Sequence, residues 1–180
     1  MIKIIASLSF FVSLLATQFS LAQEAQFPLV KGFGGIYQVT EATEKPDPDL
    51  DYYILVDMST GATDNAEISR WVDNMARMMN LHGISGVSKR QMHVKVVVHG
   101  SAIFTILGNE EYQKRFSTDN PNIPVYKALE EAGVEILVCG QSLHARGVKT
   151  SELYPGVNVA LSALTTVTTY VPKGYTLLRF

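Results

Sequence analysis

The feature that most constrains the fold is a series of short apolar runs separated by segments of helical period. Residues 52–56, 94–98 and 134–138 read Tyr-Tyr-Ile-Leu-Val, Val-Lys-Val-Val-Val and Val-Glu-Ile-Leu-Val. Near-continuous apolar runs rich in β-branched residues are typical of parallel strands buried on both faces. Their alternation with helices indicates a parallel sheet covered on both sides. We therefore predict an α/β fold, a flavodoxin-like three-layer sandwich with a mostly parallel sheet of about five strands.

The segments between these runs show helical signals of different strength. An apolar stripe predicts a helix that ends at Gly83, with Asp64 and Glu67 as a capping box; its members are Ile68, Trp71, Val72, Met75 and Met79. Residues 108–123 are polar and predict a loop or irregular helix. Residues 162–171 are ambiguous, because four threonines favour a strand while the apolar residues recur at helical spacing. We predict a helix there and a final strand at 175–178.

The N-terminal residues are expected to lie outside the folded domain. Lys3 precedes an apolar stretch, and Ser20-Leu21-Ala22 resembles a signal-peptidase site. We predict a signal peptide over residues 1–22 and a periplasmic or secreted location, with an uncleaved membrane anchor as the alternative. Residues 23–50 are predicted to form an extended N-terminal arm, and residues 51–180 the α/β domain.

Composition narrows the classes of partner. The chain carries 15 basic and 17 acidic side chains, a net charge of −2 without a basic block, which argues against nucleic acid as a partner. No contact with a membrane is expected after signal cleavage. The spacing of histidines and cysteine matches no zinc pattern, so no metal and no organic cofactor are expected.

Cys139, the only cysteine, occupies the most informative position for function. It follows a predicted strand and precedes Gly140-Gln141-Ser142, which opens a predicted helix, so its thiol faces helix amides that favour the thiolate. Asp57 and His99 also follow predicted strands. Because ligands bind at the carboxyl ends of parallel strands, these residues could form one nucleophilic site.

Each candidate also has a structural interpretation. Cys139 could be a small buried hydrophobic residue, His99 could bond a turn amide, and Asp57 could cap the turn at residues 59–61. Arg146, two helical turns beyond the cysteine, could attract an anion, stabilise the thiolate or offset a helix dipole. Residues 59–63 offer a weak phosphate-loop alternative, with binding of a small anion or nucleotide.

The order of short motifs resembles the DsrE/DsrF-like (DsrEFH) family. The main motif runs from Cys139 to Val148, with the sequence Cys-Gly-Gln-Ser-Leu-His-Ala-Arg-Gly-Val. The others are Val-Asp-Met-Ser at 56–59, Val-Val-His-Gly at 97–100, Gly-Val-Glu-Ile at 133–136 and Tyr-Pro-Gly-Val at 154–157. This resemblance covers roughly residues 47–180 and suggests an exported member.

The resemblance implies a flavodoxin-like fold and a homo-oligomer, either a trimer or a hexamer. It also implies that Cys139 carries sulfur as a persulfide and exchanges it with a sulfur donor or acceptor protein. His99 and Arg146 would then assist as catalytic residues, while Asp57, Gly100, Gly140, Gln141 and Ser142 would form the ligand-binding surroundings. Export would separate the chain from the family's cytoplasmic relay partners. The alternative is a non-catalytic oligomeric binding module with a structural cysteine.

Overall fold

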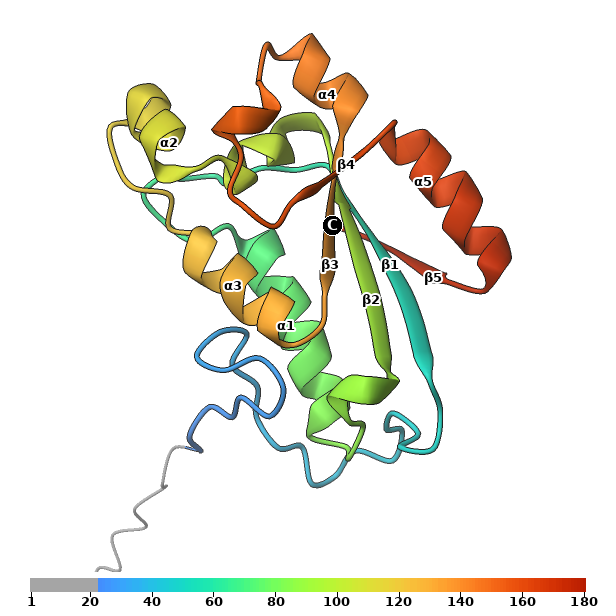
Figure 1. The fold of residues 1–180 in the computed structure, drawn as a ribbon. Coiled ribbons are helices and arrows are strands. Elements are labelled where there is room, and N and C mark those ends of the chain that lie inside the picture. The colour runs from blue at the N-terminus through green and yellow to red at the C-terminus, as the bar shows by residue number, and fades with distance from the viewer. Residues whose placement is uncertain (1–22) are drawn as a thin grey trace, which may run out of the picture.

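The computed structural model describes residues 23–180; the predicted signal peptide, residues 1–22, lies outside the described residues. Five parallel strands form one sheet in the order β4-β3-β2-β1-β5 (Figure 1). They are β1 (Tyr52–Met58), β2 (Met92–Val98), β3 (Glu135–Cys139), β4 (Asn158–Ala160) and β5 (Thr176–Arg179). The predicted α/β fold class is confirmed.

Helices cover both faces of the sheet, as a parallel sheet requires. The α-helices are α1 (Arg70–Gly83), α2 (Asn109–Phe116), α3 (Ile123–Glu131), α4 (Gly140–Ala145) and α5 (Ala163–Tyr170). Short 3-10 helices occur at Lys89–Gln91, Gly100–Ile106, Thr150–Glu152 and Val171–Lys173. Figure 1 shows α1 and α3 on one side of the sheet and α5 on the other. None of the helices in residues 23–180 is long and apolar enough to cross a membrane.

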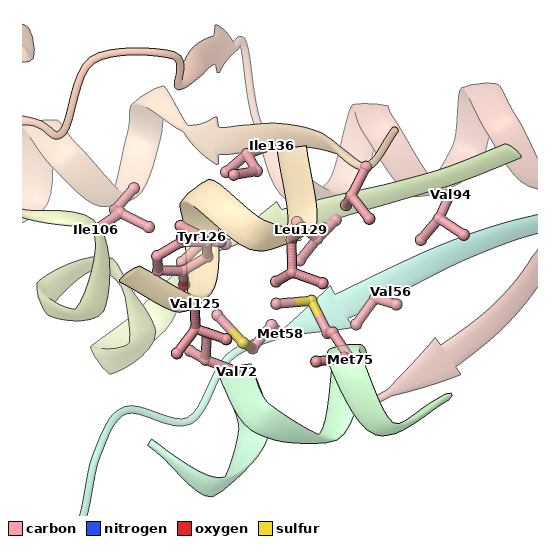
Figure 2. Close-up of a cluster of buried hydrophobic side chains, with 14 of the residues drawn as sticks. Val56, Met58, Val72, Met75, Val94, Ile106, Val125, Tyr126, Leu129 and Ile136 are labelled. Atoms are coloured by element: carbon pink, nitrogen blue, oxygen red, sulfur yellow. The ribbon is translucent and has the colours of Figure 1, made fainter. Parts of the chain in front are cut away.

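The larger core lies between the sheet and the pair α1 and α3. Figure 2 shows Val72 and Met75 of α1 and Leu129 of α3 pointing toward Val56 and Met58 of β1. These side chains are completely buried. Burial of each large apolar side chain contributes about 1.5–3 kcal/mol. Val72, Met75 and Met79 of the predicted stripe are therefore core, whereas Trp71 is only partly buried.

The opposite face is covered more sparsely and contains Cys139. Its buried residues are Leu55, Val97, Leu137, Cys139 and Ala163, the first residue of α5. Side chains alternate between faces along a strand. Asp57 and His99 come two residues after Leu55 and Val97, so they belong to this same face, which we call the α5 face.

Several local predictions need correction. Helix α1 begins at Arg70 after the N-cap Ser69, not at Asp64, and Ile68 precedes it on the surface. Asp64 instead accepts a hydrogen bond from the Ala66 backbone N–H at 2.8 Å, because an Asp side chain readily closes a local turn. The polar segment after residue 108 contains a regular helix, α2. Its opposite charges four residues apart, such as Glu110 and Lys114, support it.

The helix predicted at residues 162–171 is present as α5. Ser162 caps it, since its hydroxyl accepts the backbone N–H of Thr165 at 3.3 Å. The threonines that suggested a strand use their hydroxyls in hydrogen bonds within the helix. The hydroxyl of Thr166 donates to the carbonyl oxygen of Ser162 at 2.9 Å. Helical spacing therefore outweighed strand propensity here.

Part of the segment predicted as the N-terminal arm, residues 23–50, packs against α1. Gln26 and Ile36 form an antiparallel bridge that closes a loop. The completely buried side chain of Asn80 bonds to backbone groups of this loop, namely those of Leu29, Val30, Phe33 and Gly34. We call residues 23–50 the arm.

Candidate functional site

Parallel register places three of the predicted residues at one edge of the sheet. Strands β1, β2 and β3 are neighbours, and Val98 of β2 pairs with Val138 of β3. The next residues along these strands are His99 and Cys139, which continue the register at a strand spacing of about 4.8 Å. Asp57 pairs with Val97 and so lies one step away. The structure therefore places Asp57 in contact with His99, and Cys139 at the end of the next strand on the same α5 face.

The thiol of Cys139 is enclosed by hydrogen-bond donors from two helices. Four donors favour its charged form and lower its pKa: the Ser142 hydroxyl and the backbone N–H groups of Ala163, Ser142 and Gln141. Ser142 and Gln141 are on α4, whereas Ala163 begins α5; Figure 1 shows α4 at the carboxyl end of the sheet and α5 starting near that end. We call these four donors the thiol cradle.

The cradle determines the protonation of the thiol. Burial alone would raise the pKa of Cys139, whose residue is only 5% exposed. The hydrogen bonds of the cradle, led by the Ser142 hydroxyl, outweigh burial, so the pKa of this thiol lies below its ordinary value. The thiolate is the nucleophilic form of cysteine. The site is thus suited to nucleophilic sulfur chemistry.

Ser142 connects the cradle to the end of β2. Its hydroxyl oxygen accepts the backbone N–H of Gly100 at 3.3 Å. Gly100 has a φ of +56°, and a Cβ built there would lie 2.6 Å from the carbonyl oxygen of Ser59. Only glycine accommodates this backbone without strain, so the residue keeps its amide directed at Ser142. Gly140 opens α4 beside the carbonyl oxygen of Ala160.

Asp57 and His99 form a pair instead of the separate structural roles considered above. The Oδ1 atom of Asp57 lies 2.7 Å from the Nε2 atom of His99. The other carboxylate oxygen, Oδ2, lies 3.4 Å from the Nε atom of Arg179 on β5. The Asp57 and His99 side chains are 18% and 28% exposed, so the pair is shielded but reachable from solvent.

Two other predicted features lie away from this cluster. Arg146 is exposed at the C-terminal end of α4, the opposite end of that helix from Cys139. Within residues 23–180 it has no hydrogen bond or ion pair to the thiol. In the phosphate-loop candidate, the Gly61 backbone N–H already donates to the Ser101 hydroxyl at 3.0 Å. Among the described residues, no group of three acidic, histidine or cysteine side chains is placed to hold a metal.

Sequence reasoning missed two residues of the site. Arg179 reaches Asp57 because β5 pairs with β1, a neighbour relation that periodicity does not reveal. Ala163 reaches the sulfur through its backbone, and alanine carries no chemical signal of its own. A basic residue at the carboxyl end of the last predicted strand was the one available indication of Arg179.

Comparisons with known proteins agree with this architecture. A family model described as the DsrE/DsrF-like family matches residues 51–180. MTH1491, a protein of unknown function from Methanobacterium thermoautotrophicum, has a similar structure with a TM-score of 0.53 and 18% sequence identity, covering 72% of this chain and 100% of that chain. The ychN protein from E. coli follows with a TM-score of 0.49 and 17% identity, covering 71% and 99%. No curated protein matches the sequence.

Proposed function

Because this chain belongs to the DsrE/DsrF-like family, we propose that it is an exported sulfur carrier that forms a persulfide on Cys139. The observation that carries the proposal is the thiol cradle, which supplies four donors to one sulfur and lowers the pKa of the thiol. Such an environment favours the nucleophilic thiolate at near-neutral pH. The same donors would stabilise the negative charge of a persulfide one bond further out.

The proposed transfer balances without an external oxidant. The Cys139 thiolate attacks the outer sulfur of a donor persulfide, R–S–SH, and forms a new S–S bond. The donor's own S–S bond breaks, and its electron pair leaves with the inner sulfur as the thiolate R–S⁻. The product is Cys139–S–SH, which passes its outer sulfur to an acceptor thiolate by the same step. The reaction moves one sulfur atom and oxidises nothing overall.

Sulfur uptake by the full domain tests this proposal. Incubation with a small persulfide donor should raise the intact mass of the protein by one sulfur atom, and Cys139→Ser should abolish the gain. A reducing agent should reverse it, because the added sulfur is held by an S–S bond. Wild-type protein that keeps its mass under excess donor would contradict the proposal.

A non-catalytic module with a structural cysteine is the competing function, and the 5% exposure of Cys139 is the observation that favours it. Alkylation separates the two without a sulfur donor. The carrier requires that a small reagent labels native Cys139 near neutral pH, because the thiolate forms there. Labelling only after denaturation would support the structural role.

We also propose that the chain assembles with copies of itself. Support comes from exposed apolar side chains beside the thiol cradle: Val159 of β4, Leu161 before α5 and Leu164 of α5 are 50%, 72% and 80% exposed. Grouped apolar exposure of this kind is typical of interaction surfaces. Light scattering should give a native mass of three or six chains, and Leu164→Asp should lower it. A wild-type monomer at working concentration would contradict this proposal.

A further inference from the structure

Four side chains with acid, base or charged groups form a row across four consecutive strands on the α5 face. Cys139 ends β3, His99 follows β2, and Asp57 on β1 pairs in register with Arg179 on β5. We propose that Asp57 and Arg179 are positioning residues that hold His99 as the proton acceptor for the Cys139 thiol. This inference rests on the proposed function, since it supplies the proton route for sulfur transfer.

Asp57 selects the form of the imidazole ring. An ionised carboxylate can only accept hydrogen bonds, so the 2.7 Å contact with Oδ1 places the hydrogen on the Nε2 atom of His99. Nδ1 then keeps its lone pair and is the free base of the ring. A carboxylate that fixes a histidine in one tautomer has the same part in the Ser-His-Asp triad.

Arg179 holds the carboxylate from its other side. Its Nε lies 3.4 Å from Oδ2, so the two oxygens of Asp57 have different partners and the carboxylate plane is defined. The backbone fixes this arrangement, because the Phe180 N–H donates to the carbonyl oxygen of Asp57 at 3.1 Å. The side chain of Arg179 is 75% exposed, so solvent weakens its contribution relative to that of Asp57.

His99 is the neighbour of Cys139 in the sheet. Their strands pair up to Val98 and Val138, and both side chains continue the α5 face. The Gly100 N–H also donates to the Ser142 hydroxyl, the group that does most to lower the pKa of the thiol. The end of β2 is thereby tied to the end of β3 that carries Cys139, and His99 follows the strand next to that of the thiol.

A proton route through His99 completes the sulfur-transfer step. Nδ1 of His99 takes the proton from Cys139–SH, and the thiolate attacks the outer sulfur of R–S–SH. The donor S–S bond breaks toward the inner sulfur. The imidazolium returns its proton to that sulfur, giving R–SH and Cys139–S–SH. The ring ends in its starting state, with its tautomer fixed by Asp57.

Substitutions at Asp57 and Arg179 test the proposed positioning roles through the rate of alkylation of the Cys139 thiol, measured across pH. Below the pKa of the thiol, where Cys139 still carries its proton, Asp57→Asn should slow labelling about tenfold, the size expected for one hydrogen bond to a charged group. Arg179→Gln should slow it about twofold, and Arg179→Lys should retain most of the rate. His144→Gln, which changes an exposed histidine on α4, serves as the control and should leave the rate unchanged.

Nitrogen NMR of the His99 ring gives the second readout. The wild-type ring should show the signature of the tautomer with hydrogen on Nε2, and Asp57→Asn should give a mixture. An unchanged tautomer and an unchanged alkylation rate in Asp57→Asn would overturn the positioning role while leaving sulfur uptake by the wild type intact. If both readouts respond but the wild type accepts no sulfur, the row stands as a thiol activator and the carrier function fails.

Discussion

Replacing Asn80 with alanine is expected to lower the free energy of unfolding by about 4 kcal/mol and to release the arm from α1. The side chain of Asn80 is completely buried and makes five hydrogen bonds to the arm. Its Oδ1 accepts the N–H groups of Leu29 and Val30 at 2.9 and 2.8 Å. The two hydrogens of its Nδ2 are shared among three backbone oxygens of the same loop, those of Val30, Phe33 and Gly34. Alanine would leave these groups buried without partners.

The expected loss of stability comes mainly from the buried backbone groups that would be left without hydrogen-bond partners, and less from the net energy of the lost hydrogen bonds. A buried backbone group without a partner costs about 1–3 kcal/mol, and the loop can relieve part of that only by moving into water. Movement is opposed by Leu29, Val30 and Ile36, which are nearly or fully buried. The loss is large against a typical domain stability of about 5–15 kcal/mol.

Chemical denaturation and hydrogen exchange together measure this prediction. The midpoint of unfolding should fall, and the amide protons of residues 29–36 should lose their protection. Asn74→Ala is the matched control, because Asn74 lies on the same helix and its side chain makes no hydrogen bond within residues 23–180. That control should change stability by less than about 0.5 kcal/mol. Equal effects of the two substitutions would show that Asn80 does not hold the arm.

Asn80 also illustrates what the sequence made detectable. It follows Met79, the last residue of the predicted apolar stripe, and a buried polar side chain requires a partner. No periodicity in the sequence linked residue 80 to residues 29–34, so the arm could not be identified as its partner. Helix and strand identity are local and were largely predictable, whereas the partner of a buried amide is set by tertiary packing.

The candidate site was likewise predictable where it depends on local sequence and not where it depends on long-range contacts. Asp57, His99 and Cys139 were found because each follows an apolar run, and parallel strands end at a common edge. The pairing of β1 with β5 is a long-range contact, so Arg179 could not be connected to Asp57 beforehand. Arg146 was selected by spacing along the chain, yet the length of α4 separates it from the thiol. Spacing along a helix predicts the face on which a residue lies and its distance along the helix, but it does not show that two residues belong to the same site.

Replacing Ser142 with alanine is expected to reduce the thiolate population of Cys139 by roughly 10- to 100-fold at pH values below the thiol pKa, the size of one hydrogen bond to a charged group. The Ser142 hydroxyl is the leading contribution that lowers the pKa of Cys139, and burial opposes it. Without this hydroxyl the pKa of the thiol should rise, and the Gly100 amide should lose its acceptor.

The thiolate's ultraviolet absorbance during a pH titration measures this directly, because Cys139 is the only cysteine in the chain. Ser142→Thr retains a hydroxyl and should restore most of the wild-type curve. Ser101→Ala is the control, since the Ser101 hydroxyl bonds to Ser59 and Gly61 instead of the sulfur. A titration curve that does not move in Ser142→Ala would show that the backbone amides alone set the thiol's protonation.

The same pKa shift predicts how stability depends on pH. Between the lowered pKa of Cys139 in the folded protein and the ordinary thiol pKa, the unfolded chain keeps a proton that the folded chain has released. Stability should therefore rise with pH across this window, and the gain should be lost as pH falls through the folded pKa. Ser142→Ala raises the pKa of Cys139 in the folded protein, so the increase in stability should start at a higher pH and be smaller.

Urea denaturation of the wild type and Ser142→Ala over this pH range measures the difference. Cys139→Ser removes the contribution of the thiol entirely and so separates it from other titrating groups. A rise of equal size in all three proteins would show that the cradle does not stabilise the thiolate.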